Sequence, residues 1–281
     1  AYLGKPASGS EGDFVDEWLQ AAGGGQRFKF NLLTQKSQIE ANKIAFDHAN
    51  VPEYAFEKAG VVFNFSTDFL ENWGNPVENA RRFTDMHVYK NGRKNKFIHI
   101  SPQVSLTGAK ADRWIVINPG TEGLVALAIA SVIQKENGTY KFLKKYLQAY
   151  SPEKVAEATG VSAENLSELA IDAMEHGPLL ALGGGNVSAT DQSVETLVGV
   201  NILNAVSGAL NKTVLFSDQT TTESSTHQDL TQLISDLNGG KIKLLIVDDS
   251  NPVYALPPSM GFLQALKKTF VVSLASQKSE T

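Results

Sequence analysis

The sequence predicts an α/β fold with two Rossmann-like subdomains and mainly parallel sheets. Short apolar segments alternate with longer segments of helical pattern, which is typical of parallel strands joined by crossover helices. Two of the strands lead, after a loop, to an Asn-Pro pair and then to a helix, at 75–76 and at 251–252. The chain has 281 residues, of which 42% are hydrophobic, enough for two domains with separate cores.

In the first part of the chain, the pattern predicts three strands that alternate with three helices. The strands are expected at 60–65, 97–100 and 114–117, and the helices at 77–86, 121–133 and 140–149. We expect the segment 114–117 to be a buried strand. Because residues 124–133 are apolar on nearly every face, their helix is expected to be packed between other elements.

In the second part of the chain, serine residues mark the start of two helices. Ser151 precedes Pro152, a residue favoured at the first helical position, and Ser162 caps the next helix, which stops at Gly177. Further strands are expected at 179–182, 241–247 and 270–274, further helices at 193–209 and 260–268, and a polar surface loop at 220–227. The best single domain boundary lies near 150–151.

Two glycine turns are candidate phosphate sites. The turn at 118–120 joins a strand to a helix that opens near Thr121, and free N–H groups at a helix start suit an anion. The turn at 183–185 also follows a strand, but it lacks the G-x-G-x-x-G spacing. For both turns, an ordinary strand-to-helix connection remains the competing interpretation.

Composition excludes several classes of function. The formal net charge is −5 with interspersed signs, so there is no basic face for nucleic acid and no polybasic segment for a membrane surface. The longest strongly apolar run, 124–133, is too short to span a bilayer, and we recognise no signal-peptide pattern. Cysteine is absent, so these residues cannot ligate an iron–sulfur cluster or form a disulfide.

Other candidate sites are weaker. Asp248 and Asp249 follow a strand, but consecutive strand residues point to opposite faces, so we expect a solvated loop rather than a shared metal site. The five histidines show no metal-ligand spacing and are expected to be surface or packing residues. No nucleophile–base pair can be assigned, and we assign no catalytic and no metal-binding residue.

A series of short motifs resembles the central domains of the molybdopterin oxidoreductase superfamily, whose members include dimethyl sulfoxide reductase and formate dehydrogenase. The motifs stand in the family order and cover nearly the whole chain: Asn75-Pro76-Val77-Glu78, Ala111-Asp112, Pro119-Gly120-Thr121-Glu122-Gly123, Tyr150-Ser151-Pro152-Glu153, Thr159-Gly160-Val161, Gly183 to Gly185, Asn251-Pro252-Val253 and Ser279-Glu280-Thr281. Any one of them is weak, but their common order is specific.

The segment 65–78 is similar to the molybdopterin-like iron–sulfur subunit of bacterial alternative complex III, a membrane quinol:electron-acceptor oxidoreductase. In that group the domain resembles a molybdoenzyme without holding the molybdenum cofactor, and iron–sulfur clusters lie in a separate, cysteine-rich part. The resemblance therefore implies a fragment of a longer polypeptide, partner subunits of a membrane-bound electron-transfer complex, and a location on the periplasmic side of the cytoplasmic membrane, without direct membrane insertion by these residues.

Departures from the enzyme pattern bear on cofactor binding. Active relatives typically carry Asp-Pro-Arg where this sequence has Ser101-Pro102-Gln103, and serine cannot reproduce the charge-assisted contact of a carboxylate with guanine. Where the turn of the family has Thr-Asp, this sequence has Thr121-Glu122. Two glycines expected at Ala209 and Leu210 are missing, and side chains there would crowd a pyrophosphate.

We therefore expect a cofactor-free scaffold that is not catalytic by itself. In the alternative, the chain provides the cofactor-binding domains of an active bis-molybdopterin guanine dinucleotide oxidoreductase, and its cofactor-binding residues are Asn75, Thr121, Glu122, Gly184 and Asn251. By family resemblance, residues 43–150 form the first subdomain, and 1–42 plus 151–281 form a second, discontinuous one. The strands at 60–65, 97–100 and 114–117 should share one sheet, and those at 179–182, 244–247 and 271–274 another.

Overall fold

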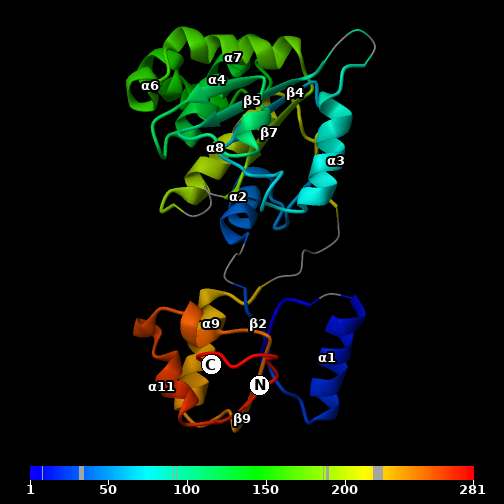
Figure 1. The fold of residues 1–281 in the computed structure, drawn as a ribbon. Coiled ribbons are helices and arrows are strands. Elements are labelled where there is room, and N and C mark those ends of the chain that lie inside the picture. Colours follow the sequence, from blue (N-terminus) through cyan, green and yellow to red (C-terminus); the bar gives the residue numbers. More distant parts are fainter. Residues whose placement is uncertain are drawn as a thin grey trace. The chain divides into compact units, whose positions relative to one another are not determined.

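The structure, a computed structural model, describes residues 1–7, 9–31, 35–90, 92, 94–185, 187, 190–217 and 224–281. The chain divides into two compact units (Figure 1). The smaller unit comprises Ala1–Thr34 and Thr220–Thr281, and the larger unit comprises Gln35–Gln219. Each unit contains a four-stranded parallel sheet with helices packed on it, which confirms the predicted α/β fold class.

The sheet of the larger unit has the strand order β6-β5-β4-β7, and all of its strands are parallel. Its strands are β4 (Val61–Phe65), β5 (Lys96–Ser101), β6 (Arg113–Val116) and β7 (Leu179–Gly183). Every residue of β4 and β7 is buried, as expected for strands covered on both faces. The predicted strand positions are therefore confirmed to within one or two residues.

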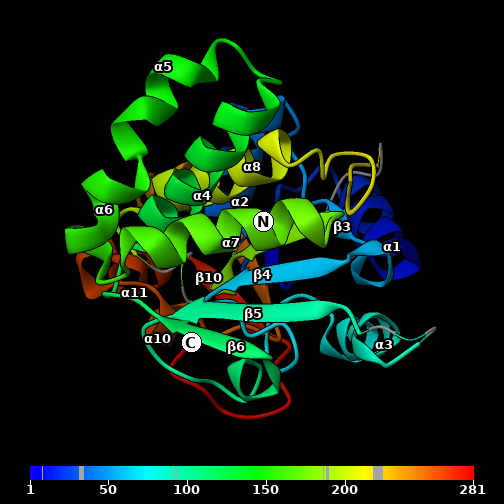
Figure 2. The same cartoon turned by 90° about the horizontal axis from the view of Figure 1, so that it is seen from above.

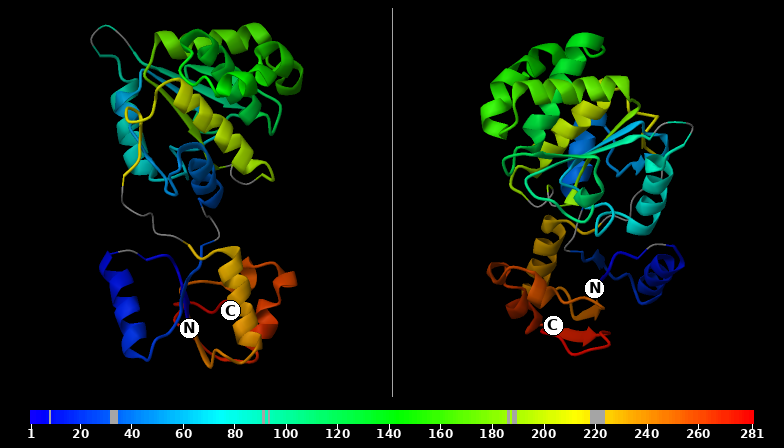
Figure 3. Two further views of the ribbon diagram at one scale, coloured as in Figure 1. Left: turned by 180° about the vertical axis from the view of Figure 1, so that it is seen from behind. Right: turned by 45° about the horizontal axis from the view of Figure 1, so that its top comes forward.

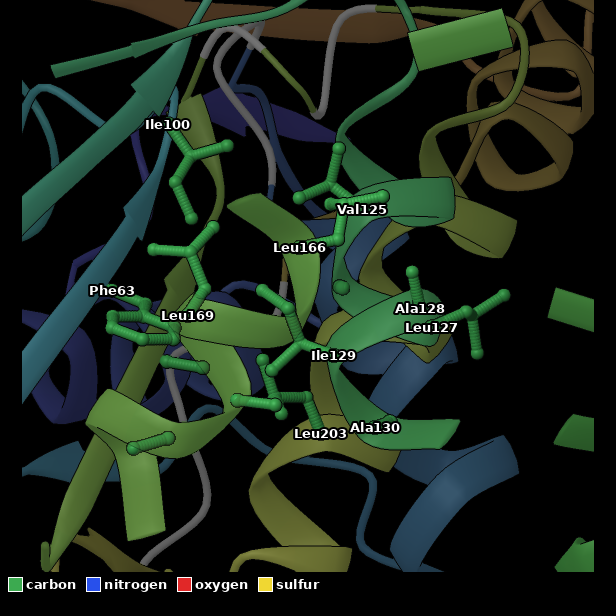
Figure 4. Close-up of a cluster of buried hydrophobic side chains, with 14 of the residues drawn as sticks. Phe63, Ile100, Val125, Leu127, Ala128, Ile129, Ala130, Leu166, Leu169 and Leu203 are labelled. Atoms are coloured by element: carbon green, nitrogen blue, oxygen red, sulfur yellow. The ribbon is translucent and has the colours of Figure 1, made fainter. Parts of the chain in front are cut away.

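One face of this sheet carries the main core, which is built around α4 (Glu122–Asn137) (Figure 2). Figure 4 shows how Phe63 and Ile100 of the sheet lie in this core with Ile129 of α4 and Leu203 of α8. The helix α4 contacts α6 (Pro152–Thr159), α7 (Ala163–Glu175) and α8 (Ser193–Val206). The prediction that the apolar helix lies between other elements is confirmed.

The opposite face is covered by aromatic side chains from α3 (Pro76–His87) and from the loops beside it. Phe69 contacts Phe83 and Phe97 edge-on, with ring centroids 5.5 and 5.6 Å apart. Phe56 and Met86 belong to the same cluster. The remaining elements of the larger unit are α2 (Lys36–Phe46), β3 (Glu53–Tyr54), the 3-10 helices Phe56–Lys58, Gly108–Lys110 and Gln148–Tyr150, α5 (Leu143–Leu147) and β8 (Val214–Leu215).

The smaller unit has the strand order β10-β9-β1-β2, again with all pairs parallel. Its strands are β1 (Tyr2–Gly4), β2 (Arg27–Lys29), β9 (Leu244–Asp248) and β10 (Phe270–Ser273), and its helices are α1 (Gly9–Ala21), α9 (His227–Asn238), α10 (Pro252–Ala255), the 3-10 helix Pro258–Met260 and α11 (Phe262–Leu266). Figure 3 shows the N-terminal and C-terminal segments side by side in this unit, where β1 pairs with β9. The sequence did not predict β1 or β2, because both are only three residues long.

The predicted sheet membership of residues 179–182 is wrong. These residues form β7, which pairs with β4 from Val61↔Leu179 to Phe65↔Gly183 rather than with β9. The helices α4 to α7 pack on one face of the sheet and return the chain to the free edge of β4. Residues 151–219 therefore belong to the larger unit, and the division of the structure differs from the predicted 43–150 and 1–42 plus 151–281.

Three smaller expectations need correction. The segment 114–117 was expected to be buried, but Trp114 and Val116 are 42% and 55% exposed because β6 is an edge strand. The helix expected at 140–149 is shorter and ends in a 3-10 turn. Of the loop expected at 220–227, residues 220–223 lie outside the described residues, and Thr226 caps α9 through a capping box with Asp229. Among the described helices, none is long and apolar enough to cross a membrane.

Candidate functional site

The carboxyl ends of the four strands of the larger sheet meet at one edge. The chain leaves β4 through α3 toward β5 on one side, and it reaches β7 on the other side of β4 through α4 to α7. The strand order therefore reverses between β4 and β7. Ligands of open α/β sheets bind beyond the strand ends at such a switch point.

A cavity of about 180 Å³ lies at this edge. Its lining comes from residues at or after the carboxyl ends of the four strands and from the first turn of α8: Ser66, Asp68, Ser101, Pro102, Gln103, Ser105, Pro119, Gly120, Glu122, Val187, Thr190 and Thr196. The charged members of this lining are Asp68 and Glu122, both carboxylates, and no lysine, arginine or histidine is among these described residues. The charged groups of the described lining are therefore all negative.

Glu122 is held in place by a serine from the neighbouring strand end. Ser66 donates its hydroxyl hydrogen to Oε1 of Glu122 over 2.9 Å, and the two residues are 8% and 6% exposed. Ser66 adopts a positive φ of 53° directly after β4. Glu122 lies in the first turn of α4, where the helix dipole favours a negative charge. This carboxylate opposes any external anion that approaches the start of α4.

The glycine turn after β7 is filled by an indole ring. A Cβ on Gly184 would lie 2.4 Å from Nε1 of Trp73, and the φ of Gly184 is 154°. The hydroxyl of Thr67 donates to the Gly184 carbonyl over 3.5 Å. The close approach of Trp73 and the positive φ together explain why glycine occupies this position. An ordinary turn is therefore favoured over a phosphate site here.

A buried histidine lies on β5, two residues before the end of that strand. His99 is 1% exposed, and Nδ2 of Asn64 donates to its Nδ1 over 2.9 Å. The orientation of the Asn64 amide follows from its Oδ1, which accepts the Thr67 N–H. Burial lowers the pKa of His99, and the Gln103 backbone and the charge of Asp68 oppose this effect. His99 is therefore neutral near pH 7, with its proton on Nε2, which makes no hydrogen bond of normal geometry.

The structure brings together only some of the five residues that the alternative interpretation assigns to cofactor binding. Glu122 lines the cavity, and Thr121 stands beside it with its hydroxyl donating to the Asn118 carbonyl over 2.6 Å. Gly184 lies against Trp73. Asn75 is exposed and caps α3 by accepting the Glu78 N–H over 3.4 Å, so it takes no part in the cavity.

Asn251 belongs to the smaller unit and is bound by the end of the chain. Its Nδ2 donates to Glu280 over 2.6 Å, and its Oδ1 accepts from the Thr281 hydroxyl over 2.9 Å. In the same unit, Asp248 accepts from the Tyr2 hydroxyl and Asp249 pairs with Lys5. The two aspartates thus have separate partners, as expected for consecutive residues. Within the described ranges, no three His, Cys, Asp or Glu side chains gather as metal ligands.

Only some of the other departures from the enzyme pattern lie at this cavity. Ser101 and Gln103 do line the cavity, and the Ser101 hydroxyl donates to the Gln103 carbonyl over 2.6 Å. Ala209 and Leu210 do not line it, because Ala209 is fully buried in the aromatic cluster around Phe69 and Leu210 packs against that cluster. Sequence reasoning missed Ser66 and Asp68 as members of the site. Their position just after a predicted strand is a signal that could have found them.

No family model matches the chain. Its sequence is 29% identical over 247 residues to the menaquinone reductase molybdopterin-binding-like subunit of Nitratidesulfovibrio vulgaris, a match that covers 81% of this chain and 36% of that protein. A shorter match, 36% identical over 75 residues, links 26% of the chain to 8% of perchlorate reductase subunit alpha of Dechloromonas aromatica. The chain is a homologue of the molybdopterin oxidoreductases.

A solved structure supports the fold of this homologue. Acetylene hydratase from Pelobacter acetylenicus superposes with a TM-score of 0.69 at 14% sequence identity, over 96% of this chain and 46% of that chain. The chain thus spans about a third of the length of the menaquinone reductase subunit and less than half of acetylene hydratase.

The residues at the edge of the larger sheet do not fit the pyrophosphate of a molybdopterin guanine dinucleotide. A buried carboxylate lies at the start of α4, no cationic side chain lines the described cavity, and Trp73 fills the glycine turn. The cavity of about 180 Å³ is also smaller than the roughly 300–1,000 Å³ of ordinary small-molecule sites.

Proposed function

We propose that this chain is the cofactor-free α/β part of a molybdopterin-oxidoreductase-like subunit of a membrane-associated respiratory complex. In this proposal the complex is of the quinol:acceptor type and resembles alternative complex III. Iron–sulfur clusters elsewhere in a longer polypeptide carry the electrons, and the chain provides a rigid scaffold that contacts partner subunits on the periplasmic side of the membrane.

The buried Glu122–Ser66 contact carries the cofactor-free part of the proposal. A carboxylate that is 6% exposed at the helix start would repel a phosphate, and the hydrogen bond from Ser66 keeps it there. The respiratory part of the proposal is supported by the relative described as a molybdopterin-binding-like subunit of menaquinone reductase.

The alternative is an active bis-molybdopterin guanine dinucleotide oxidoreductase. The observation that favours it is the position of the cavity at the switch point of the sheet, next to the Pro119-Gly120 turn. Glu122 would then have to turn away from Ser66 when the cofactor binds.

Metal and pterin analysis of the full-length protein, purified from its native host as an assembled complex, separates the two functions. After the subunit is isolated, we expect neither stoichiometric molybdenum nor a fluorescent pterin derivative after acid oxidation. One molybdenum atom per subunit together with the pterin signal would establish the alternative and refute the scaffold.

A further inference from the structure

The larger unit has a second and larger cavity, of about 510 Å³, on its helical side. It is a groove between α2 and α8, which pack against each other (Figure 1). Its lining includes Ile44 and Phe46 of α2, Ile202 and Ala205 of α8, and two aromatic residues from other segments, Phe142 and Phe216. We call these six residues the α2–α8 groove. None of them belongs to the cavity at the strand ends.

The chemistry of the α2–α8 groove indicates an uncharged occupant. Its described lining contains no aspartate, glutamate, lysine or arginine. The imidazole ring of His48 lies flat on the Phe216 ring, with centroids 4.5 Å apart and planes 9° apart, so it adds to the aromatic surface. An occupant that brought a charge into this groove would lose hydration without gaining an ionic partner.

The rim of the groove indicates a polypeptide rather than a small molecule. Ile44 and Phe142 are 61% and 76% exposed although both line the groove. A small ligand within the groove would leave much of these rim side chains in water. A protein segment that lies across the groove, as an amphipathic helix does in other helix-lined grooves, would cover the floor and the rim together.

We propose that the α2–α8 groove is the docking site of an apolar segment of the same polypeptide outside residues 1–281. The inference rests on the proposed function, in which this chain is part of a longer subunit. Two observations favour this occupant over a separate partner. The chain spans only 36% and 46% of the two long relatives. The described lining of the groove has no charged side chain, and permanent contacts are more hydrophobic than exchangeable ones.

A photo-crosslinking amino acid at position 142 of the full-length protein tests the proposal. The complex is irradiated, the subunit is isolated, and crosslinked peptides are identified by mass spectrometry. We expect a crosslink within the subunit between position 142 and an uncharged peptide from outside residues 1–281. The same amino acid at Ile171, which is 47% exposed on α7 away from the groove, is the matched control and should not form that crosslink.

A substitution that places a charge in the groove provides a second test. Ala205 lies near the carboxyl end of α8, where the helix dipole tolerates a cation, so Ala205→Lys should fold. We expect this variant to lose the crosslink at position 142, whereas Ala205→Met should keep it. A crosslink to another subunit or to lipid, or none at all, would overturn the proposal.

Failure of this inference and failure of the proposed function can be told apart. A native subunit no longer than 281 residues removes the premise that both share. In a longer subunit, the crosslink reports only on the groove, while molybdenum and pterin analysis reports only on the cofactor.

Discussion

At the scale of single residues, the buried contact between Ser66 and Glu122 decides the character of the strand-end cavity. Ser66→Ala removes the hydroxyl that donates to the Glu122 carboxylate and leaves a buried charge less satisfied. We expect a loss of unfolding free energy of about 1–3 kcal/mol. Urea unfolding of the chain measures it, and Thr84→Ala, which removes an exposed helix hydroxyl, is the control with an expected change within about 0.5 kcal/mol. Equal effects of the two substitutions would contradict the importance of the contact.

His99 should make stability depend on pH in the acidic range. Burial lowers its folded-state pKa below the unfolded value of about 6.5, so the unfolded chain binds the proton more readily. The stabilising effect of the neutral imidazole is complete above pH 6.5 and is lost as the pH falls from there toward the folded pKa. In that window we expect His99 to contribute a slope of at most about 1.4 kcal/mol per pH unit.

The comparison of wild type with His99→Gln isolates this slope. The unfolding free energy of the variant should fall less between pH 7 and pH 5.5 than that of the wild type. His227→Gln, at the exposed start of α9, serves as the control and should keep the wild-type slope. A parallel decline in all three proteins would show that His99 is not the group responsible.

At the scale of secondary-structure elements, two glycines bring α4 and α8 into close contact. A Cβ on Gly123 would lie 2.9 Å from the Cα of Thr196, and one on Gly199 would lie 3.0 Å from the Gly123 carbonyl. The backbones therefore touch, and the larger residues of both helices pack on either side of this crossing. The apolar stretch of α4 was predictable from the sequence, but the partner that it contacts through Gly123 was not.

Gly123→Ala should therefore destabilise the larger unit although alanine favours helices. The steric conflict with backbone atoms costs about 1–3 kcal/mol, more than the helix propensity gained, which is at most about 1 kcal/mol. Thermal and urea unfolding measure the change. Ser131→Ala, which removes only a hydroxyl that donates to the Ala128 carbonyl of the same helix, should be nearly neutral. A stabilising Gly123→Ala would refute the close crossing.

At the scale of the whole molecule, each unit has its own sheet and its own core. The smaller sheet is assembled from both ends of the sequence, with β1 between β9 and β2. Leu3 of β1 is fully buried against Leu245 and Leu233. The described sheet pairings join no strand of one unit to a strand of the other.

Leu3→Asp should unfold the smaller unit selectively, because it buries an unpaired carboxylate in that core. In hydrogen-exchange mass spectrometry we expect β9 to lose protection while β4 keeps it. Lys5→Ala, two residues further on and exposed, should leave both strands protected. Simultaneous loss of protection in β4 would show that the two units fold as one.

Much of the fold followed from local sequence, and less of the site did. The strand pattern at 60–65, the apolar helix after Thr121 and the serine cap at 162 were predicted because each depends on neighbouring residues. Of the predicted site residues, Glu122 lines the strand-end cavity. Asn75 and Asn251 instead make local contacts in different units, and Ser66 and His99 were missed, because a motif does not show which side chains meet across a sheet.

The sequence by itself determined the α/β class, most of the helices and strands, and the family resemblance, since hydrophobic periodicity and turn chemistry act over a few residues. Only the tertiary structure decided that β7 joins β4, that Tyr2 to Gly4 forms the centre of the smaller sheet, and that Ser66 reaches Glu122. Each of these contacts joins residues far apart in the chain. A parallel strand exposes equivalent hydrogen-bonding groups to any neighbour, so its partner is chosen by how the connecting helices pack, and that choice is made in three dimensions.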